Sequence, residues 1–445
     1  MIHGMKIGKG GIFPREIYPV KLESFFARRI TFKNHRSVTN LVVRLAVLSI
    51  AVAIATIEIA FSFVQGFENE IKKKVVGFGS HVQIGNYFRT SNAEMVPLPK
   101  NDPSIQKIRT LDNVLSVSPY VQRWGLLRSK AGQAGVALKG VDSGYEWAFF
   151  ESNMKEGRLP VFPDSVEESG EVLISRKTAN SLDLKPGDKA RAFFIDDPIR
   201  RRPIVVAGIY ETGMEEFDNL VVICDMRMLQ QIQGWTSNQV TGFEVNLGSI
   251  EPQCQWVLGE KFPFIEKNCP DPIQLAASRI NDETPYLFGA APINELYPEI
   301  FDWLYLQRQN VWFIMTLMII VAVINMTSVV LILILERTRT VGLLRALGMA
   351  KGGLRRIFVI NAFYLIGIGA VAGNVLGLGL LASQDIFGWL RVSQESYFIE
   401  VVPVAWVWEE FLFVNLSLIA ICTLFMFLPS VVVNSIRPVK ALRFD

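Results

Sequence analysis

Four long apolar stretches constrain this chain more strongly than any other feature of its sequence. The first, Leu45–Val64, holds one acidic residue, Glu58, and the other three hold no charged residue: Val311–Leu335, Ile357–Ser383 and Phe411–Val433. A hydrocarbon core about 30 Å thick requires about 20 apolar residues in helical form, because lipid offers no hydrogen-bond partner to an irregular backbone. The sequence therefore predicts four transmembrane helices, in preference to buried helices of a soluble protein.

The composition predicts at least one water-soluble part as well. Hydrophobic residues make up 50% of the 445 residues, which is high for a soluble enzyme. Charged residues make up 20%, which is too many for a chain that lies wholly in the membrane. The formal net charge of +3 is small and indicates no nucleic-acid partner.

The charges between the apolar stretches predict their orientation. Residues 1–44 hold nine Lys and Arg against two acids, and 336–356 holds six against one. Segment 384–410 has the opposite character, with five acids against Arg391. Because basic loops remain in the cytoplasm, we expect both termini and 336–356 inside, and 71–305 and 384–410 outside. The first span follows a basic segment and precedes no small-residue cleavage site, so we expect an anchor and not a removable signal peptide.

The segment 71–305 is too long for a loop and alternates between strand-like and helix-like patterns. We therefore predict a membrane α-helical protein with a large extracytoplasmic α+β domain of two subdomains, the second inserted at about 145–238. Helix-forming residues continue beyond Val64 and also precede the second span at 298–310. Two helical stalks are expected to carry this domain.

Local patterns predict several elements of the α+β domain. Residues 170–194 read as strand, helix, turn and strand, and a hairpin is expected about Ala131 and Gly132. Asp225 is placed to cap a short helix. A further helix is predicted from Pro252 to Phe262.

These patterns divide the chain into nine parts. They are 1–44, a cytoplasmic N-terminus with an interfacial helix; 45–70, the first transmembrane helix and stalk; 71–305, the outer domain; 306–335, the second stalk and transmembrane helix; 336–356, a cytoplasmic helix; 357–383, the third transmembrane helix; 384–410, an outer loop; 411–433, the fourth transmembrane helix; and 434–445, a cytoplasmic tail.

The usual signs of catalysis are missing from the sequence. No G-x-x-x-x-G-K-[ST] motif occurs, so ATP hydrolysis is expected from a separate chain, and this chain is not predicted to be an enzyme by itself. The three histidines lie far apart and suggest neither a metal site nor a catalytic triad. An oxidising compartment would permit a disulfide between Cys254 and Cys269, with buried free thiols as the alternative.

Two features inside the spans are candidate sites. Glu58 is an intramembrane acid, and such residues usually face a partner or a wet cavity. It serves either in proton transfer or as a hydrogen-bonded group at a helix interface. Gly369, Gly373 and Gly377 recur every four residues, which allows another helix to approach closely, either within the subunit or from a partner.

The cytoplasmic segment 336–356 reads as a short amphipathic basic helix. Val341, Leu344 and Leu347 fall on one helical face, and Gly348 with Gly352–Gly353 is expected to end the helix. Such a helix lies against either lipid head groups or a soluble partner.

Motifs in three parts of the chain resemble a known family. FFARRITFKNHRS (25–37) precedes the first span and FVQGFENEIKKKVVGFGSHVQI leads out of it; the cytoplasmic segment reads ERTRTVGLLRALGM; and YFIEVVPVAW and PSVVVNSIRPVKALRF lie around the fourth span. In this order they resemble the FtsX/MacB/LolC–LolE group of ABC transporter permeases, and most closely its LolC/LolE branch.

The resemblance implies a multi-pass subunit of the bacterial inner membrane with a MacB-like periplasmic domain. It would pair with a second permease, in a hetero- or homodimer, and with two copies of a cytoplasmic LolD-like ATPase, which would bind ATP and Mg. This chain would bind no cofactor. By mechanotransmission it would extract lipoproteins and pass them to a periplasmic LolA-like carrier. The residues implied in ATPase coupling are Glu336, Arg337, Thr338, Val341, Leu344, Arg345, Ala346, Leu347 and Gly348.

Acyl chains would enter between the first two spans, and residues are candidates for lipoprotein binding by their position there. They are Phe61, Phe63, Val64, Phe67, Trp312, Phe313 and Met315. The LolC branch carries a long hook that recruits the carrier, whereas the corresponding FFIDDPIRRRPIVV is short. Either the chain is LolE-like, or it acts as a homodimer, or the carrier docks differently.

Other members of this superfamily offer alternative functions. A MacB-like efflux or export permease usually carries a fused ATPase, and an FtsX-like regulator of periplasmic hydrolases has a smaller outer domain. A membrane-anchored sensor or scaffold would leave the basic segment 336–356 without a purpose.

Overall fold

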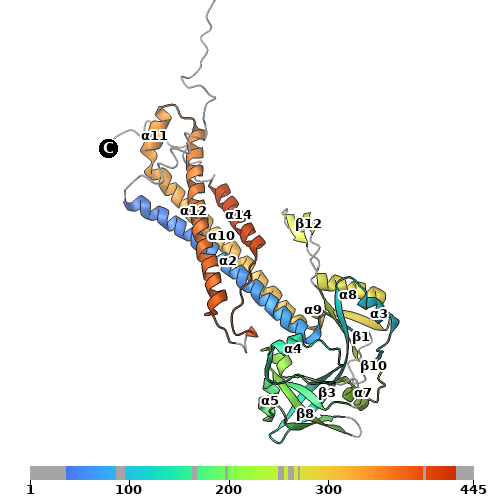
Figure 1. Cartoon of the computed structure of the whole chain (residues 1–445). Helices are drawn as coiled ribbons and strands as arrows, with labels where there is room; N and C mark the ends of the chain where they lie inside the picture. The colour runs from blue at the N-terminus through green and yellow to red at the C-terminus, as the bar shows by residue number, and fades with distance from the viewer. Residues whose placement is uncertain are drawn as a thin grey trace, which may run out of the picture. The chain divides into compact units, whose positions relative to one another are not determined.

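The computed structural model describes residues 37–86, 96–162, 168–195, 199–248, 255–258, 265–268, 271–393 and 397–426. The chain forms two compact units (Figure 1). The first, called here the membrane unit, comprises Met1–Phe67, Leu306–Leu390 and Val402–Asp445. The second, called the α+β unit, comprises Glu68–Tyr305 and Arg391–Val401.

Long helices build the membrane unit. They are α2 (Ser37–Gly79), α10 (Pro298–Glu336), α12 (Lys351–Phe387) and α14 (Trp408–Phe425), with the short α11 (Thr338–Ala346) between α10 and α12. Each of these four long helices, which lie in the described part of the chain, has the length and apolar composition needed to cross a membrane, in agreement with the predicted spans. The end of the fourth predicted span, 427–433, lies outside the described residues.

Helix α2 is one continuous helix of 43 residues, and α10 one of 39, so helix covers both predicted stalk sequences. Their buried faces in the membrane unit meet in one apolar cluster with α12 and α14. Ile54 of α2, Met326 of α10, Ile366 of α12 and Leu418 of α14 are all fully buried there. Large apolar side chains on the remaining surfaces of α10, α12 and α14 are exposed, as expected for helices that face lipid.

A ten-stranded sheet forms the framework of the α+β unit, in the order β14-β1-β11-β3-β4-β9-β6-β8-β5, with β7 pairing with β3 and β8. The strands are β1 (Val82–Asn86), β3 (Val114–Arg128), β4 (Gln133–Val141), β5 (Met154–Gly157), β6 (Glu171–Ser175), β7 (Lys189–Phe194), β8 (Arg200–Tyr210), β9 (Val221–Asp225), β11 (Gly242–Leu247) and β14 (Phe288–Pro292). The helices α3 (Pro103–Arg109), α5 (Arg176–Leu182), α7 (Met226–Gln233) and α8 (Pro272–Glu283) contribute to the same apolar core.

Several local predictions in the α+β unit are confirmed. The β3–β4 hairpin pairs Arg128 with Gln133 about the predicted turn, and β6, α5 and β7 follow one another as expected. Asp225 caps α7, because its Oδ1 accepts a hydrogen bond of 2.9 Å from the backbone N–H of Arg227. Strand β3 pairs with β11 at one end and with β4 and β7 at the other, so it joins 145–238 to the flanking strands. The division into two subdomains stays a prediction.

The helix predicted from Pro252 to Phe262 is wrong. Residues Gln255–Leu258 form strand β12, which pairs in antiparallel fashion with β13 (Ile265–Asn268). The segment contains Trp256 and Val257, residue types that favour strands, and a pairing partner ten residues further along overrides weak helical periodicity. Cys254 and Cys269 lie outside the described residues, so their pairing is untested. Cys224 and Cys422 are buried free thiols.

We expect the α+β unit to lose stability as the pH falls below about 6.5. Burial lowers the pKa of His81 from its ordinary value of 6.5, although a hydrogen bond with Asn246 opposes the shift. The His81 Nδ1 accepts a hydrogen bond of 3.2 Å from the backbone N–H of Leu247. The folded chain therefore binds fewer protons than the unfolded chain in this range. The stability that neutral His81 contributes above pH 6.5 is lost as the pH falls through its folded pKa.

Thermal unfolding of the detergent-solubilised chain at about pH 5.5 and about pH 7.5 measures this effect. His81→Gln can still accept the Leu247 bond but does not titrate, so its unfolding temperature should depend less on pH. An equal pH dependence in both proteins would contradict the assignment to His81.

Candidate functional site in the membrane unit

The glycine stripe of α12 packs against α2 within the same subunit. A Cβ atom added at Gly369 would lie 2.8 Å from Cβ of Ile50, and one at Gly373 would lie 2.8 Å from the carbonyl oxygen of Ala51. These distances are shorter than real contacts, so only glycine permits the observed approach of the two helices. The structure therefore decides between the two packing partners that the sequence left open, in favour of α2.

The same stripe leads to the intramembrane acid. A Cβ at Gly377 would lie 2.5 Å from Oε2 of Glu58, so the buried carboxyl group rests against the bare backbone of α12. Asn415 Nδ2 on α14 donates a hydrogen bond of 3.1 Å to Oε1 of Glu58, and Asn374 Nδ2 on α12 donates one of 2.7 Å to Oδ1 of Asn415. Among the described residues, Oε2 of Glu58 has no hydrogen-bond partner. One polar network thus links α2, α12 and α14.

Sequence reasoning named Glu58 and Gly377 but not the two asparagines. The available signal was their residue type, because an amide inside an uncharged span normally has a hydrogen-bonding partner on a neighbouring helix. Sequence alone does not say which helix supplies that partner, since Asn374 and Asn415 are 41 residues apart and Asn415 is 357 residues from Glu58.

We expect Asn415→Leu to destabilise the membrane unit by on the order of 1 kcal/mol, because it removes the hydrogen bonds to Glu58 and Asn374 inside an apolar bundle. Glu58→Gln keeps an oxygen that can accept from Asn415 and should cost less. A double-mutant cycle of Glu58→Leu with Asn415→Leu, followed by unfolding in mixed micelles, measures the coupling between the two side chains. Strictly additive losses would show that the contact contributes nothing.

The segment before α14 also packs tightly on α2. A Cβ at Gly66 would lie 2.4 Å from the carbonyl oxygen of Pro403, and Ser62 Oγ donates a hydrogen bond of 2.9 Å to the carbonyl oxygen of Ala405. Gly66 belongs to the QGFE exit of the first span and Pro403 to the VVP approach to the fourth. Two of the segments on which the family resemblance rested are therefore in direct contact.

The candidates for lipoprotein binding differ in their exposure and do not form one continuous surface. Phe61 and Trp312 meet edge to face with ring centroids 5.8 Å apart, so these two do join α2 to α10. Met315 is buried in the apolar core of the bundle, whereas Phe313 is 72% exposed. Phe63, Val64 and Phe67 are half-buried. Whether any of them binds an acyl chain stays a prediction.

The cytoplasmic segment forms α11, but two details differ from expectation. Gly348, with φ of +93°, follows the helix and allows the turn, whereas Gly352 and Gly353 belong to the first turn of α12, which begins at Lys351. The expected single apolar face is also divided. Val341 is 2% exposed, Leu344 is half-buried, and Leu347 is 71% exposed.

The physical reason is that steps of three residues leave Val341, Leu344 and Leu347 spread over about 120° of the helix surface. Only the side with Val341 and Leu344 packs on the apolar core of the bundle. The other residues implied in ATPase coupling surround this turn. Glu336 ends α10, Arg337 lies at the start of α11, Thr338 and Arg345 are half-buried, and Ala346 and Gly348 are exposed. The neighbouring Leu343 is 52% exposed and was missed. Leu343 and Leu347, called here the exposed leucines of α11, thus present apolar surface beside basic residues.

Comparison with known proteins matches both units. The MacB-like periplasmic core domain matches residues 44–251, and the FtsX-like permease C-terminal domain matches 312–438. The lipoprotein-releasing system transmembrane protein LolC of Neisseria meningitidis serogroup B is 22% identical, over 94% of this chain and 98% of that protein. LolE of Haemophilus influenzae is 20% identical, over 92% and 96%. The crystal structure of the periplasmic region of MacB from Actinobacillus actinomycetemcomitans has a TM-score of 0.34 and 13% identity, over 51% of this chain and 95% of that structure.

Proposed function

We propose that this chain, which matches the MacB-like periplasmic core domain over 44–251 and the FtsX-like permease C-terminal domain over 312–438, is the membrane subunit of an ABC transporter that releases lipoproteins from the inner membrane. The observation that carries the proposal is the likeness to the LolC and LolE proteins named above, which covers more than nine tenths of this chain and of each of those two proteins. The matched region includes the membrane helices and most of the α+β unit, so the likeness is not confined to one domain.

In the proposed mechanism, an ATPase on a separate chain docks on the cytoplasmic turn formed by the end of α10 and by α11. The exposed leucines of α11 support this role, because apolar side chains at a membrane–water boundary, flanked by Arg345, suit a protein groove better than bulk water. Both termini then lie in the cytoplasm and the α+β unit in the periplasm, in agreement with the loop charges.

ATP-driven movement of the membrane helices would be transmitted by α2 and α10, since each is a single helix with residues in both units. The substrate would be a lipoprotein in the outer leaflet, handed to a LolA-like carrier. The apolar surface at Phe61 and Trp312 is the proposed contact for acyl chains. A second permease, either a different chain or a copy of this one, would complete the transporter.

Reconstitution tests the proposal. The chain is purified with its ATPase and any second permease, placed in proteoliposomes with a tri-acylated lipoprotein, and supplied with ATP and a soluble carrier. ATP-dependent appearance of the lipoprotein in the carrier fraction is expected. Retention of the lipoprotein in the vesicles, together with ATP-dependent drug export or activation of a wall hydrolase, would overturn the proposal in favour of a MacB-like or FtsX-like role.

A further inference from the structure

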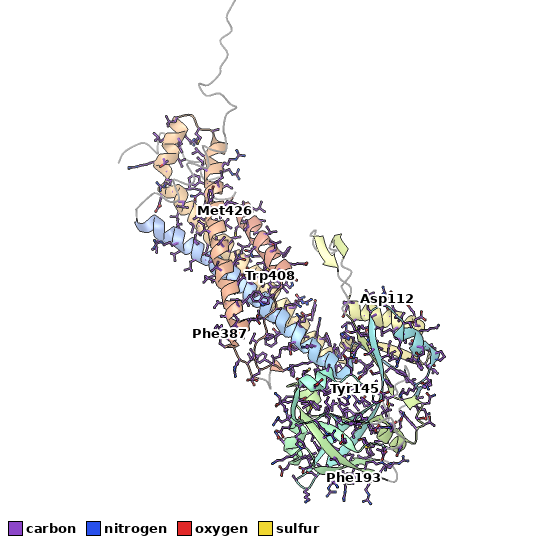
Figure 2. All side chains as sticks on the ribbon, in the orientation of Figure 1. Asp112, Tyr145, Phe193, Phe387, Trp408 and Met426 are labelled. Atoms are coloured by element: carbon purple, nitrogen blue, oxygen red, sulfur yellow. The ribbon has the colours of Figure 1, made fainter. Side chains whose placement is uncertain are left out.

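The last turn of α2 is held in the α+β unit by a buried lysine. Lys139 Nζ, on β4, donates a hydrogen bond of 2.7 Å to the backbone carbonyl oxygen of Phe78. The same ammonium group forms an ion pair of 2.7 Å with Glu244 on β11 and lies 3.3 Å from the hydroxyl oxygen of Tyr145. Lys139 is 8% exposed and Glu244 is 3% exposed. Tyr145 is labelled within this unit in Figure 2.

A buried ion pair by itself is weak evidence of a stabilising role. The free energy lost when two charges are removed from water is often as large as the free energy gained from their attraction. Well-packed apolar residues of similar volume often stabilise the fold equally well. Burial alone would lower the pKa of Lys139, but the negative charge of Glu244 outweighs it and raises that pKa above its ordinary value. The lysine therefore remains charged at the end of α2.

The position of this charge, at the C-terminal end of α2, indicates a role for the ion pair other than stabilising the fold. The C-terminal carbonyls of a helix carry a partial negative charge and lack partners within the helix. Ser80 turns the chain out of the helix with φ of +59°, so the carbonyl of Phe78 is one of these groups. Lys139 supplies its missing donor from the centre of the sheet, where β4 and β11 both pair with β3, the longest strand.

Two further contacts restrain the same end of α2. Lys74 Nζ donates hydrogen bonds of 2.6 Å to the carbonyl oxygen of Thr212 and 2.7 Å to that of Phe398. The ring of Phe78 stacks on Phe217 with centroids 4.6 Å apart. These contacts hold the side of the helix against Thr212, Phe398 and the short helix α6 (Glu215–Asp218), whereas Lys139 binds a carbonyl of the last turn from β4 of the central sheet.

We propose that Lys139 is a positioning residue that fastens the end of α2 to the central strands. Displacement of the helix then moves the α+β unit, because the end of the helix cannot slide along the sheet. The inference rests on the proposed function, in which α2 transmits movement. Glu244 keeps Lys139 charged and oriented, and Tyr145 completes its set of acceptors. Without the tie, the ATPase would turn over while the release of substrate falls behind.

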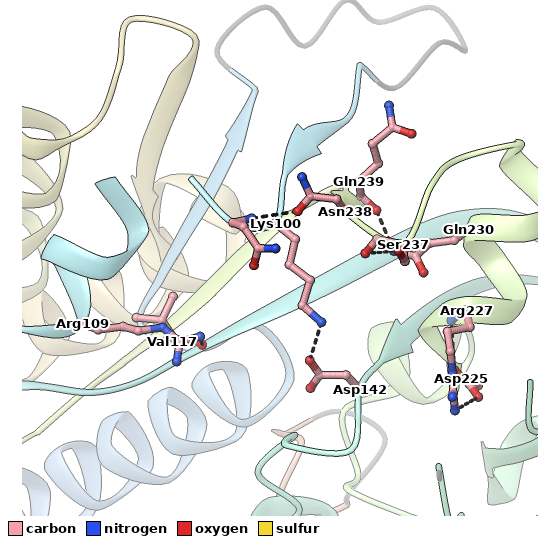
Figure 3. A network of polar contacts seen from close by, with 11 residues as sticks. Lys100, Arg109, Val117, Asp142, Asp225, Arg227, Gln230, Ser237, Asn238 and Gln239 are labelled. Carbon is pink, nitrogen blue, oxygen red and sulfur yellow. Dashed lines mark hydrogen bonds and ion pairs between the residues drawn. The ribbon is translucent and has the colours of Figure 1, made fainter. Parts of the chain in front are cut away.

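The test uses the double variant Lys139→Met/Glu244→Leu in the full chain. Apolar residues of similar size are expected to keep the sheet folded, because they remove both members of the buried pair together. The matched control is Lys100→Met/Asp142→Leu, which removes an ion pair of 3.1 Å elsewhere in the same unit (Figure 3). Two quantities are measured: hydrogen exchange of the backbone amides in residues 76–82, and lipoprotein released per ATP hydrolysed in the reconstituted complex.

In the Lys139 variant, exchange at the end of α2 is expected to accelerate about tenfold, and release per ATP to fall about tenfold with ATP hydrolysis retained. The control should change neither quantity. Unchanged exchange, or an unchanged release per ATP, would overturn the role of Lys139. If the unmodified chain itself releases no lipoprotein, the proposed function fails, and the exchange measurement alone then decides whether Lys139 fastens α2.

Discussion

Replacing Gly373 with leucine is expected to prevent the membrane unit from folding. Even a single Cβ at this position would lie 2.8 Å from the carbonyl oxygen of Ala51 and 2.9 Å from Cβ of Ile54. Neither atom is the end of a flexible side chain, so α2 and α12 must separate to admit the leucine. Separation would also draw Glu58 away from Asn415. The expected cost is on the order of 3 kcal/mol or more, which exceeds what most single substitutions do.

The same helix provides a matched control. Gly367 and Gly379 flank the stripe on α12, and a Cβ added at either would meet nothing within 4 Å. Gly367→Leu should therefore leave the fold intact, while Gly373→Leu should yield aggregated or degraded chain. Size-exclusion chromatography and thermal unfolding in detergent measure both. Equal behaviour of the two variants would show that the close approach of α2 and α12 is not required.

Replacing both exposed leucines of α11 with aspartate is expected to uncouple the chain from its proposed ATPase without unfolding it. Leu343 and Leu347 are 52% and 71% exposed, so they contribute little to the core of the subunit. In a protein interface a small number of buried apolar anchors supply most of the affinity, and losing two should weaken binding by about 100-fold or more. The measurement is co-purification of the ATPase with the detergent-solubilised permease, and substrate-stimulated ATP hydrolysis.

Two variants give this experiment its controls. Leu347→Met keeps an apolar side chain and should retain the ATPase. Val341→Asp places a charge at a buried position of the same helix, so it should reduce the amount of folded chain instead of binding alone. Normal co-purification of the ATPase by the double aspartate variant would exclude α11 as the docking element. The lipid head-group alternative would then be favoured.

Features that depend on one helix or one turn at a time were open to prediction. The four spans follow from apolar length, and the cap at Asp225 and the β3–β4 hairpin follow from residue types at short spacing. The exposure of single side chains did not follow from the element alone. Helix α11 formed as expected, yet Leu347 is exposed although its spacing placed it on the same face as the buried Val341.

The failures share a cause, which is dependence on a partner elsewhere in the chain. Residues Gln255–Leu258 became a strand because Ile265–Asn268 pairs with them. Lys139 was not among the residues that the sequence singled out, and nothing near it in sequence indicates Glu244, 105 positions away. Periodicity reports which face of an element is apolar, but not what the face meets.

The sequence by itself predicted four membrane-spanning helices, since lipid leaves a long uncharged apolar segment no stable form but a helix. Among the described residues, four helices have the length and apolar composition to cross a membrane. It also supplied the acid Glu58 and the glycine stripe as separate features. Only the tertiary structure decided that they belong to one place, with Gly377 facing Glu58 and Asn415 binding its carboxyl group. Hydropathy is a property of each segment alone, whereas close approach of helices and the pairing of buried polar groups depend on distances between segments far apart in the chain.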